Sequence, residues 1–153
     1  MTTFPALVVL LLRSELAAAH GALLAPTTRR GGTQYENDPV QSNVAEAFVC
    51  RHAARNAAVP LHQLTAGGTM QLTWNFGAAH VGDCAVFVSY DVLLARSAQR
   101  YFKVANLPKC REQNNQPMSF TLPTWLPGGE AIVRWDWYAL HVFPSVEFYC
   151  VRR

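Results

Sequence analysis

The stretch EAIVRWDWY (residues 130–138) decides the fold prediction, because two sets of side chains alternate along it. The first set is Ala131, Val133, Trp135 and Trp137, and the second is Ile132, Arg134, Asp136 and Tyr138. Successive side chains of a β-strand point to opposite faces of its sheet. The alternation therefore predicts a strand whose tryptophan face packs into a core.

Three further runs indicate strands. TMQLTWN (69–75) and SVEFYC (145–150) alternate in the same way, and CAVFVSYD (84–91) is apolar on both faces, as expected of a central strand. Prolines and glycines such as PGG (127–129) separate the runs. The predicted class is all-β: an antiparallel, immunoglobulin-like β-sandwich with one short helix and long loops. The helix is expected in the alanine-rich residues 41–58.

The N-terminus has the character of a secretory leader. FPALVVLLL (4–12) is much shorter than the roughly 20 residues that cross a bilayer. The small residues AAA (17–19) follow and provide a cleavage site. We expect residues 1–19 to be removed as a signal peptide, leaving a secreted single domain, residues 20–153, that begins with His20. A buried N-terminal helix is the alternative interpretation.

Charge and cysteine content narrow the possible partners. The net charge is only +3, and no run of lysine or arginine suggests nucleic acid. No later segment could span a membrane, so we expect neither a membrane nor a nucleic-acid partner. We also expect the chain to be a monomer. Four cysteines in a secreted domain predict two disulfides, with three pairings open. Their wide spacing lacks the CxxC pattern of zinc sites.

Two histidines form a candidate metal site. His20, if it is the first residue of the mature chain, offers both its amine and its ring. His80 lies in NFGAAHVGDC (75–84), where small neighbours leave space for another molecule. Three nitrogen donors in a tetragonal arrangement suit copper(II). Taken alone, either histidine is more simply a structural residue.

The last strand adds two polar side chains on one face. Glu147 and Tyr149 are two residues apart, so they project together, away from Val146 and Phe148. The tyrosine could be a distant axial group of a metal, and the glutamate could transfer a proton. An exposed sheet face with ordinary polar residues is the alternative.

These motifs resemble one enzyme family. HGALLAPTTR (20–29) resembles the mature start of lytic polysaccharide monooxygenases, and GAAHVGDC (77–84) resembles the segment with their second copper histidine. GGEAIVRWDWYALH (128–141) followed by EFY (147–149) resembles their last strands. Small catalytic-only members, such as the oomycete pectin-cleaving group, look nearest.

The resemblance implies the site and the reaction. One copper ion would be held by the amine and ring of His20 and the ring of His80, with Tyr149 axial. His141 and Glu147 would hold and protonate the activated oxygen. An external electron donor, small molecule or protein, and O2 or H2O2 as co-substrate would drive hydroxylation at C1 or C4 of an extracellular polysaccharide. Pectin (homogalacturonan) is favoured over cellulose or chitin.

The resemblance also implies two disulfides, Cys84–Cys110 and Cys50–Cys150. The chain departs from the family pattern here, because Cys150 follows Tyr149 directly where two residues usually intervene. This departure makes Cys84–Cys110 the safer pair.

Two aromatic residues could bind sugar rings. Tyr35 and Trp125 lie in polar or proline-flanked surroundings, although a surface position without function is the simpler explanation for each. Two other function classes remain. A non-catalytic polysaccharide-binding module would not need His20 at its terminus, and a copper-carrying protein would not need Glu147.

Overall fold

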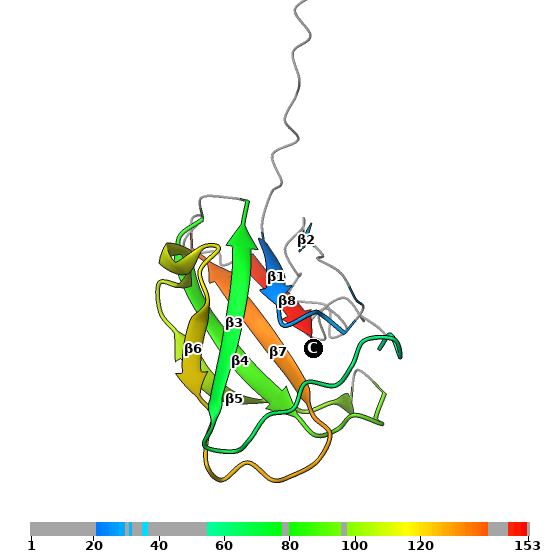
Figure 1. Ribbon diagram of the computed structural model, residues 1–153. Coiled ribbons are helices and arrows are strands. Elements are labelled where there is room, and N and C mark those ends of the chain that lie inside the picture. The colour runs from blue at the N-terminus through cyan, green and yellow to red at the C-terminus, as the bar shows by residue number, and fades with distance from the viewer. Residues whose placement is uncertain are drawn as a thin grey trace, which may run out of the picture.

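Two antiparallel β-sheets form the sandwich in the computed structural model, which describes residues 21–29, 31, 35–36, 55–77, 80–95, 98–140 and 147–152, with 35–36 and 147–152 as backbone only (Figure 1). The first sheet has the order β2-β1-β3-β6, and the second has the order β5-β4-β7-β8. The strands are β1 (Gly21–Ala25), β2 (Tyr35–Glu36), β3 (Thr69–Phe76), β4 (Gly82–Ser89), β5 (Phe102–Leu107), β6 (Met118–Thr121), β7 (Ile132–Ala139) and β8 (Glu147–Arg152). The predicted antiparallel β-sandwich is confirmed.

The predicted helix at 41–58 lies largely outside the described residues. Its last four residues, 55–58, are described and are not helical. The described residues include the 3₁₀ turn η3 (Cys110–Gln113), between β5 and β6. None of the described helices is long and apolar enough to cross a membrane.

The core lies between the sheets and is rich in tryptophan. Trp74 of β3 and Trp135 of β7 stack with ring centroids 5.6 Å apart, and Phe76 packs on Trp137 at 4.2 Å. All four side chains are buried. The alternation in residues 130–138 therefore predicted the core-facing side of β7 correctly, because its tryptophans point toward the other sheet.

The outer face of β7 is also buried, which the alternation did not predict. Asp136 is fully buried and Arg134 nearly so. The two side chains form an ion pair at 2.8 Å, and the rings of Phe87 and Tyr101 lie 4.6 and 4.5 Å from the Arg134 guanidinium. The ion pair and the two aromatic rings offset the cost of burying these charges, because a buried charge is tolerated only with partners.

Five strand termini meet at one end of the sandwich, which we call the His80 end. β1, β4 and β8 begin there, and β3 and β7 end there (Figure 1). The register fixes this arrangement, because Gly21 pairs with Phe76, and Ala139 pairs with both Gly82 and Glu147. We call the opposite end, where β3 and β7 begin and β4 ends, the far end.

Candidate copper site

His80 lies between β3 and β4, two residues before Gly82. Its imidazole stacks on the indole of Trp137, with ring centroids 5.8 Å apart and an angle of 20° between the planes. The indole is fully buried, whereas His80 is half-buried, so one side of the imidazole is supported and the residue still reaches the surface. The ring is therefore supported on one side, in a residue that is partly exposed to solvent.

The strand register brings the backbone of two other candidate residues to the same end. Tyr149 pairs with Trp137, the residue that supports the His80 ring, and Glu147 pairs with Ala139 at the end of β7. Only the backbone of β8 is described, so these positions are established without their side chains. Both residues belong to β8, and residues two apart on a strand share a face, as predicted for positions 147 and 149.

The remaining two candidates, His20 and His141, lie outside the described residues. Their neighbours in the chain are described. Gly21 begins β1 beside Phe76, and the Leu140 N–H donates to the Val81 carbonyl at 2.8 Å. Both neighbours belong to the His80 end.

Several contacts hold the strands and loops together at the His80 end. The predicted disulfide between Cys84 and Cys110 is present and ties the start of β4 to η3. The Lys109 N–H donates to the Asp83 carboxylate at 2.7 Å. The Trp74 indole N–H donates to the Cys110 carbonyl at 2.9 Å, so the loop before β6 is attached to the core as well. The Cys50–Cys150 pair lies outside the described side chains.

Asn114 extends the edge of β3 beyond its partner strand. β6 pairs with β3 only from Thr69 to Leu72. Further along, the Asn114 Oδ1 accepts the Phe76 N–H at 2.7 Å, and its Nδ2 donates to the Phe76 carbonyl at 3.3 Å. The side chain thus replaces a missing strand at the position that pairs with Gly21.

One titratable group at this end has a strongly shifted pKa. Burial raises the pKa of Tyr138 to about 12, and the negative charge of Asp136 adds to the shift. The phenol lies near Asp136 Oδ2, at 3.4 Å. Tyr138 therefore stays protonated near neutral pH.

The donor chemistry at the His80 end suits copper(II), because imidazole nitrogen is a ligand that this metal prefers. Among the side chains that the structure describes, no three His, Cys, Asp or Glu gather into a metal-binding group. Of the predicted nitrogen donors, the His80 ring is described and is held by an aromatic contact, as a metal-binding ring needs to be. His80 therefore fits a copper ligand, and the other donors remain predictions.

The two aromatic residues proposed for sugar binding lie at opposite ends. Tyr35 belongs to β2 and pairs with Ala22 near the His80 end, with its side chain undescribed. Trp125 is 65% exposed and contacts Phe102 at 5.6 Å, beside the start of β5 at the far end. The structure thus does not bring Trp125 together with His80.

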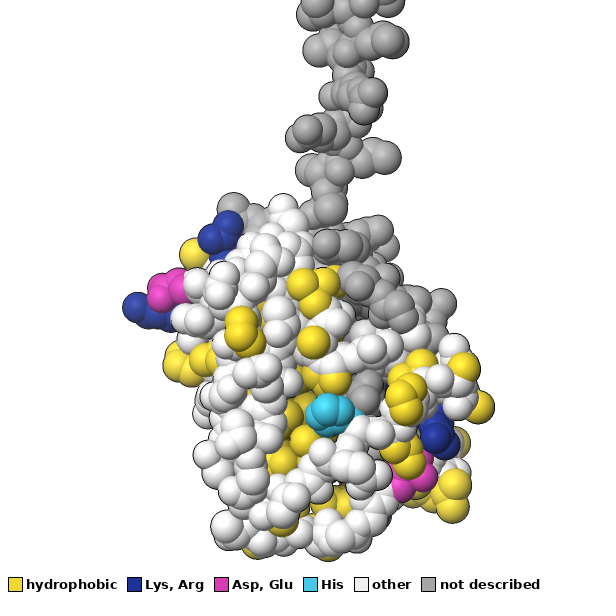
Figure 2. Space-filling model, in the orientation of Figure 1, with side chains coloured by type: hydrophobic (Ala, Val, Ile, Leu, Met, Phe, Trp, Pro, Cys, Tyr) yellow, Lys and Arg dark blue, Asp and Glu magenta, His cyan; other side chains and the backbone are white. Residues whose placement is uncertain are grey.

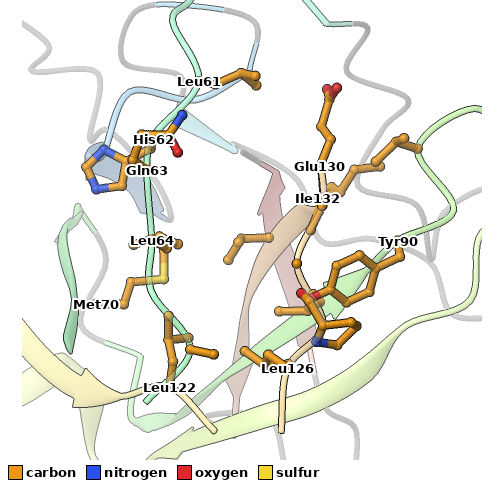
Figure 3. A pocket seen from close by; sticks show the side chains of 18 of the residues that line it. Leu61, His62, Gln63, Leu64, Met70, Tyr90, Leu122, Leu126, Glu130 and Ile132 are labelled. Atoms are coloured by element: carbon orange, nitrogen blue, oxygen red, sulfur yellow. The ribbon is translucent and has the colours of Figure 1, made fainter. Parts of the chain in front are cut away.

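A cavity of about 740 Å³ opens at the far end, and sequence reasoning missed it. Figure 3 shows Leu64, Met70 and Leu122 on one side of it, with Tyr90, Leu126 and Ile132 on the other. In the space-filling view, hydrophobic side chains border a hollow in the lower half of the molecule (Figure 2). His80, the candidate copper ligand whose side chain is described, does not line this cavity.

Comparison with solved structures identifies the fold as that of the lytic polysaccharide monooxygenases. The chain is similar to HiLPMO9B, at 18% identity and a TM-score of 0.62, over 76% of this chain and 60% of that one. It is also similar to a cellulose-active polysaccharide monooxygenase from M. thermophila, at 18% identity and a TM-score of 0.63, over 87% and 75%. A third match is the cellulose-active CelS2 (ScLPMO10C) in complex with copper, at 15% identity and a TM-score of 0.50, over 87% and 97%.

The sequence itself matches one family. Residues 14–151 fit the model of Auxiliary Activity family 9, formerly GH61. The chain therefore belongs to this family. It spans about 60% of the length of HiLPMO9B. A search of curated proteins finds no match.

Proposed function

We propose that this chain is a secreted, copper-dependent monooxygenase that cleaves a cell-wall polysaccharide by hydroxylating C1 or C4 of a glycosidic bond. Membership of Auxiliary Activity family 9 supports the class of activity. The observation that carries the proposal for this chain is the His80 imidazole, stacked on buried Trp137 at the end where β1 begins and β8 pairs with β7.

In this proposal the chain's residues divide into ligands and proton-handling groups. The amine and ring of His20, the ring of His80 and the phenol of Tyr149 would hold one copper ion. When bound, copper would supply one-electron redox chemistry with an external reductant and O2 or H2O2. Glu147 and His141 hold the co-substrate by hydrogen bonds and deliver a proton to it.

The exposed side chains beside His80 suit a polymer. Val81 is 63% exposed and Leu140 is 40% exposed, and the hydrogen bond between their backbones keeps them adjacent. Such an apolar pair can receive the C–H face of a sugar ring without closing over it, so a long chain can lie across the site. We propose pectin as the first substrate to test, before cellulose and chitin.

The test starts from mature protein whose first residue is His20. Copper-loaded protein is incubated with ascorbate and pectin, cellulose or chitin, and mass spectrometry identifies oxidised products. The His80→Ala variant should lose tight copper binding and cleavage, whereas Trp125→Ala, at the far end, should keep both. Cleavage that survives in His80→Ala would overturn the proposal.

Glu147→Ala separates an enzyme from a copper carrier. Because Glu147 is not assigned as a ligand, the variant should keep its copper affinity and lose about 10²-fold in cleavage rate, the usual scale for a positioned acid–base group. If wild type binds copper and cleaves no polysaccharide, the copper-carrying function replaces this one. If it binds polysaccharide but no copper, it is a binding module.

A further inference from the structure

Among the glycines that the structure describes, Gly82 has the least space for a side chain. A Cβ added there would overlap the Tyr138 carbonyl oxygen and would also lie 2.9 Å from the Tyr138 carbonyl carbon and 3.2 Å from the Ala139 Cα. These atoms are all backbone, so no side chain can rotate to make room. At Gly21, in contrast, the closest atoms belong to the Phe76 side chain and lie at 3.0 and 3.3 Å.

The glycine is needed for the approach of two backbones, not for an unusual backbone conformation. Gly82 does not have a positive φ, unlike Gly31, Gly67 and Gly129. An L-residue could therefore adopt its conformation, and only the contact with β7 excludes a side chain. Glycine inside a strand commonly marks such a close approach.

A displacement at Gly82 would be transmitted toward His80. In the other direction β4 is fixed, because Cys84 is bonded to Cys110 and pairing with β7 continues to Ser89. Toward the N-terminus Val81 is the one residue between Gly82 and His80, and its carbonyl accepts the Leu140 N–H at 2.8 Å. The start of β4 is therefore the part of the strand that would yield, and its displacement would move His80 relative to β7.

The indole of Trp137 receives the imidazole on the β7 side. It can do so because Trp137 belongs to the same strand that Gly82 approaches, two residues before Ala139. We propose that Gly82 and Trp137 are positioning residues for His80: the missing side chain lets β4 close on β7, and the indole face then fixes the imidazole ring. The consequence for copper binding rests on the proposed function, whereas the ring position does not.

The first experiment needs no metal. In the apo protein, the ring current of Trp137 should shift the Cε1–H proton resonance of His80 upfield. Gly82→Ala should move this resonance toward the value of an unstructured histidine. Gly128→Ala is the matched control, because a Cβ there meets no atom within 4 Å, and it should leave the resonance unchanged.

The second measurement is copper(II) affinity by calorimetry, with an EPR spectrum of each folded variant. Gly82→Ala should weaken binding by about 10- to 100-fold, the usual loss when a group that orients a metal-binding histidine is removed. The EPR spectrum should change with it, whereas Gly128→Ala should match the wild type. A destabilised but correctly positioned site would keep its spectrum.

A further variant covers the case in which Gly82→Ala does not fold. Trp137→Phe leaves the backbone contact intact and replaces the indole by a smaller ring, so the upfield shift should decrease and copper binding should weaken. An unchanged His80 resonance in folded Gly82→Ala or Trp137→Phe would overturn the positioning role. Absence of copper binding by the wild type would refute the proposed function, and the apo resonance would still decide the role of Gly82.

Discussion

The two ends of the sandwich are built in opposite ways. At the His80 end, backbones touch at Gly82, a disulfide ties β4 to η3, and Asn114 completes the edge of β3. At the far end a cavity of about 740 Å³ reaches buried core side chains such as Met70 and Ile132. The exposed segment 60–66 lines one of its walls.

The difference teaches where a rigid site can be placed in a small sandwich. A metal-binding ring must be held to within a fraction of an ångström, and this requires close-packed support on several sides. The His80 end offers that support through backbone and ring contacts. The far end has volume and exposed leucines such as Leu61 and Leu93, which suit adaptable contacts but not fixed geometry.

Among the predicted effects on stability, removal of the disulfide at the His80 end should be the largest. The double variant Cys84→Ala, Cys110→Ala loses a crosslink between residues separated by 26 positions. The free energy of unfolding should fall by about 3–4 kcal/mol, because the unfolded chain gains conformational entropy. Urea denaturation of the variant and of oxidised wild type gives the value. A loss below about 1 kcal/mol would show that the His80 end does not depend on this crosslink.

Truncating Asn114 should have the next largest effect. Asn114→Ala removes both hydrogen bonds to Phe76, which is 4% exposed, and leaves its backbone groups on that side without the side-chain partner. The expected cost is about 1–3 kcal/mol in unfolding free energy. Asn106→Ala, on an exposed position of β5, is the matched control and should change stability by less than about 0.5 kcal/mol. Equal effects of the two variants would contradict the edge-completing role of Asn114.

The smallest effect is expected at the cavity rim of the far end. Arg55 and Glu130 form an ion pair at 3.5 Å with side chains 46% and 44% exposed. Solvent screening limits such a pair to about 0–1 kcal/mol. A double-mutant cycle with Arg55→Ala and Glu130→Ala measures the coupling energy. A value near 3 kcal/mol would mean that the far end is held as firmly as the His80 end, and the comparison would fail.

Much of the fold follows from local sequence. The alternating residues 69–75 lie on β3, and the alternating residues 130–138 overlap β7. The run 84–91 overlaps β4, which begins and ends two residues earlier. Local patterns predicted the strands but not their partners. β5, for example, has a mixed burial pattern without a clean alternation, so its sequence gives a weak signal.

The candidate site was predictable only in part. The motifs indicated His80, but nothing in them indicated that Trp137 supports its ring, because that contact depends on the register of β4 with β7. The buried pair Arg134–Asp136 was missed for the same reason, since its cover comes from Phe87 and Tyr101 in other segments. Such contacts depend on which distant segments pack together, and hydrophobic periodicity along the chain does not reveal this packing.

The distribution of tryptophan gives the protein two separate fluorescent reporters. Of its four tryptophans, Trp74, Trp135 and Trp137 are at most 1% exposed, whereas Trp125 is 65% exposed. Iodide in solution should therefore quench only the red-shifted emission of Trp125 at the far end. A paramagnetic ion on His80 should instead quench the blue-shifted emission of Trp137, whose ring contacts the imidazole. One unlabelled sample thus reports on both ends at once.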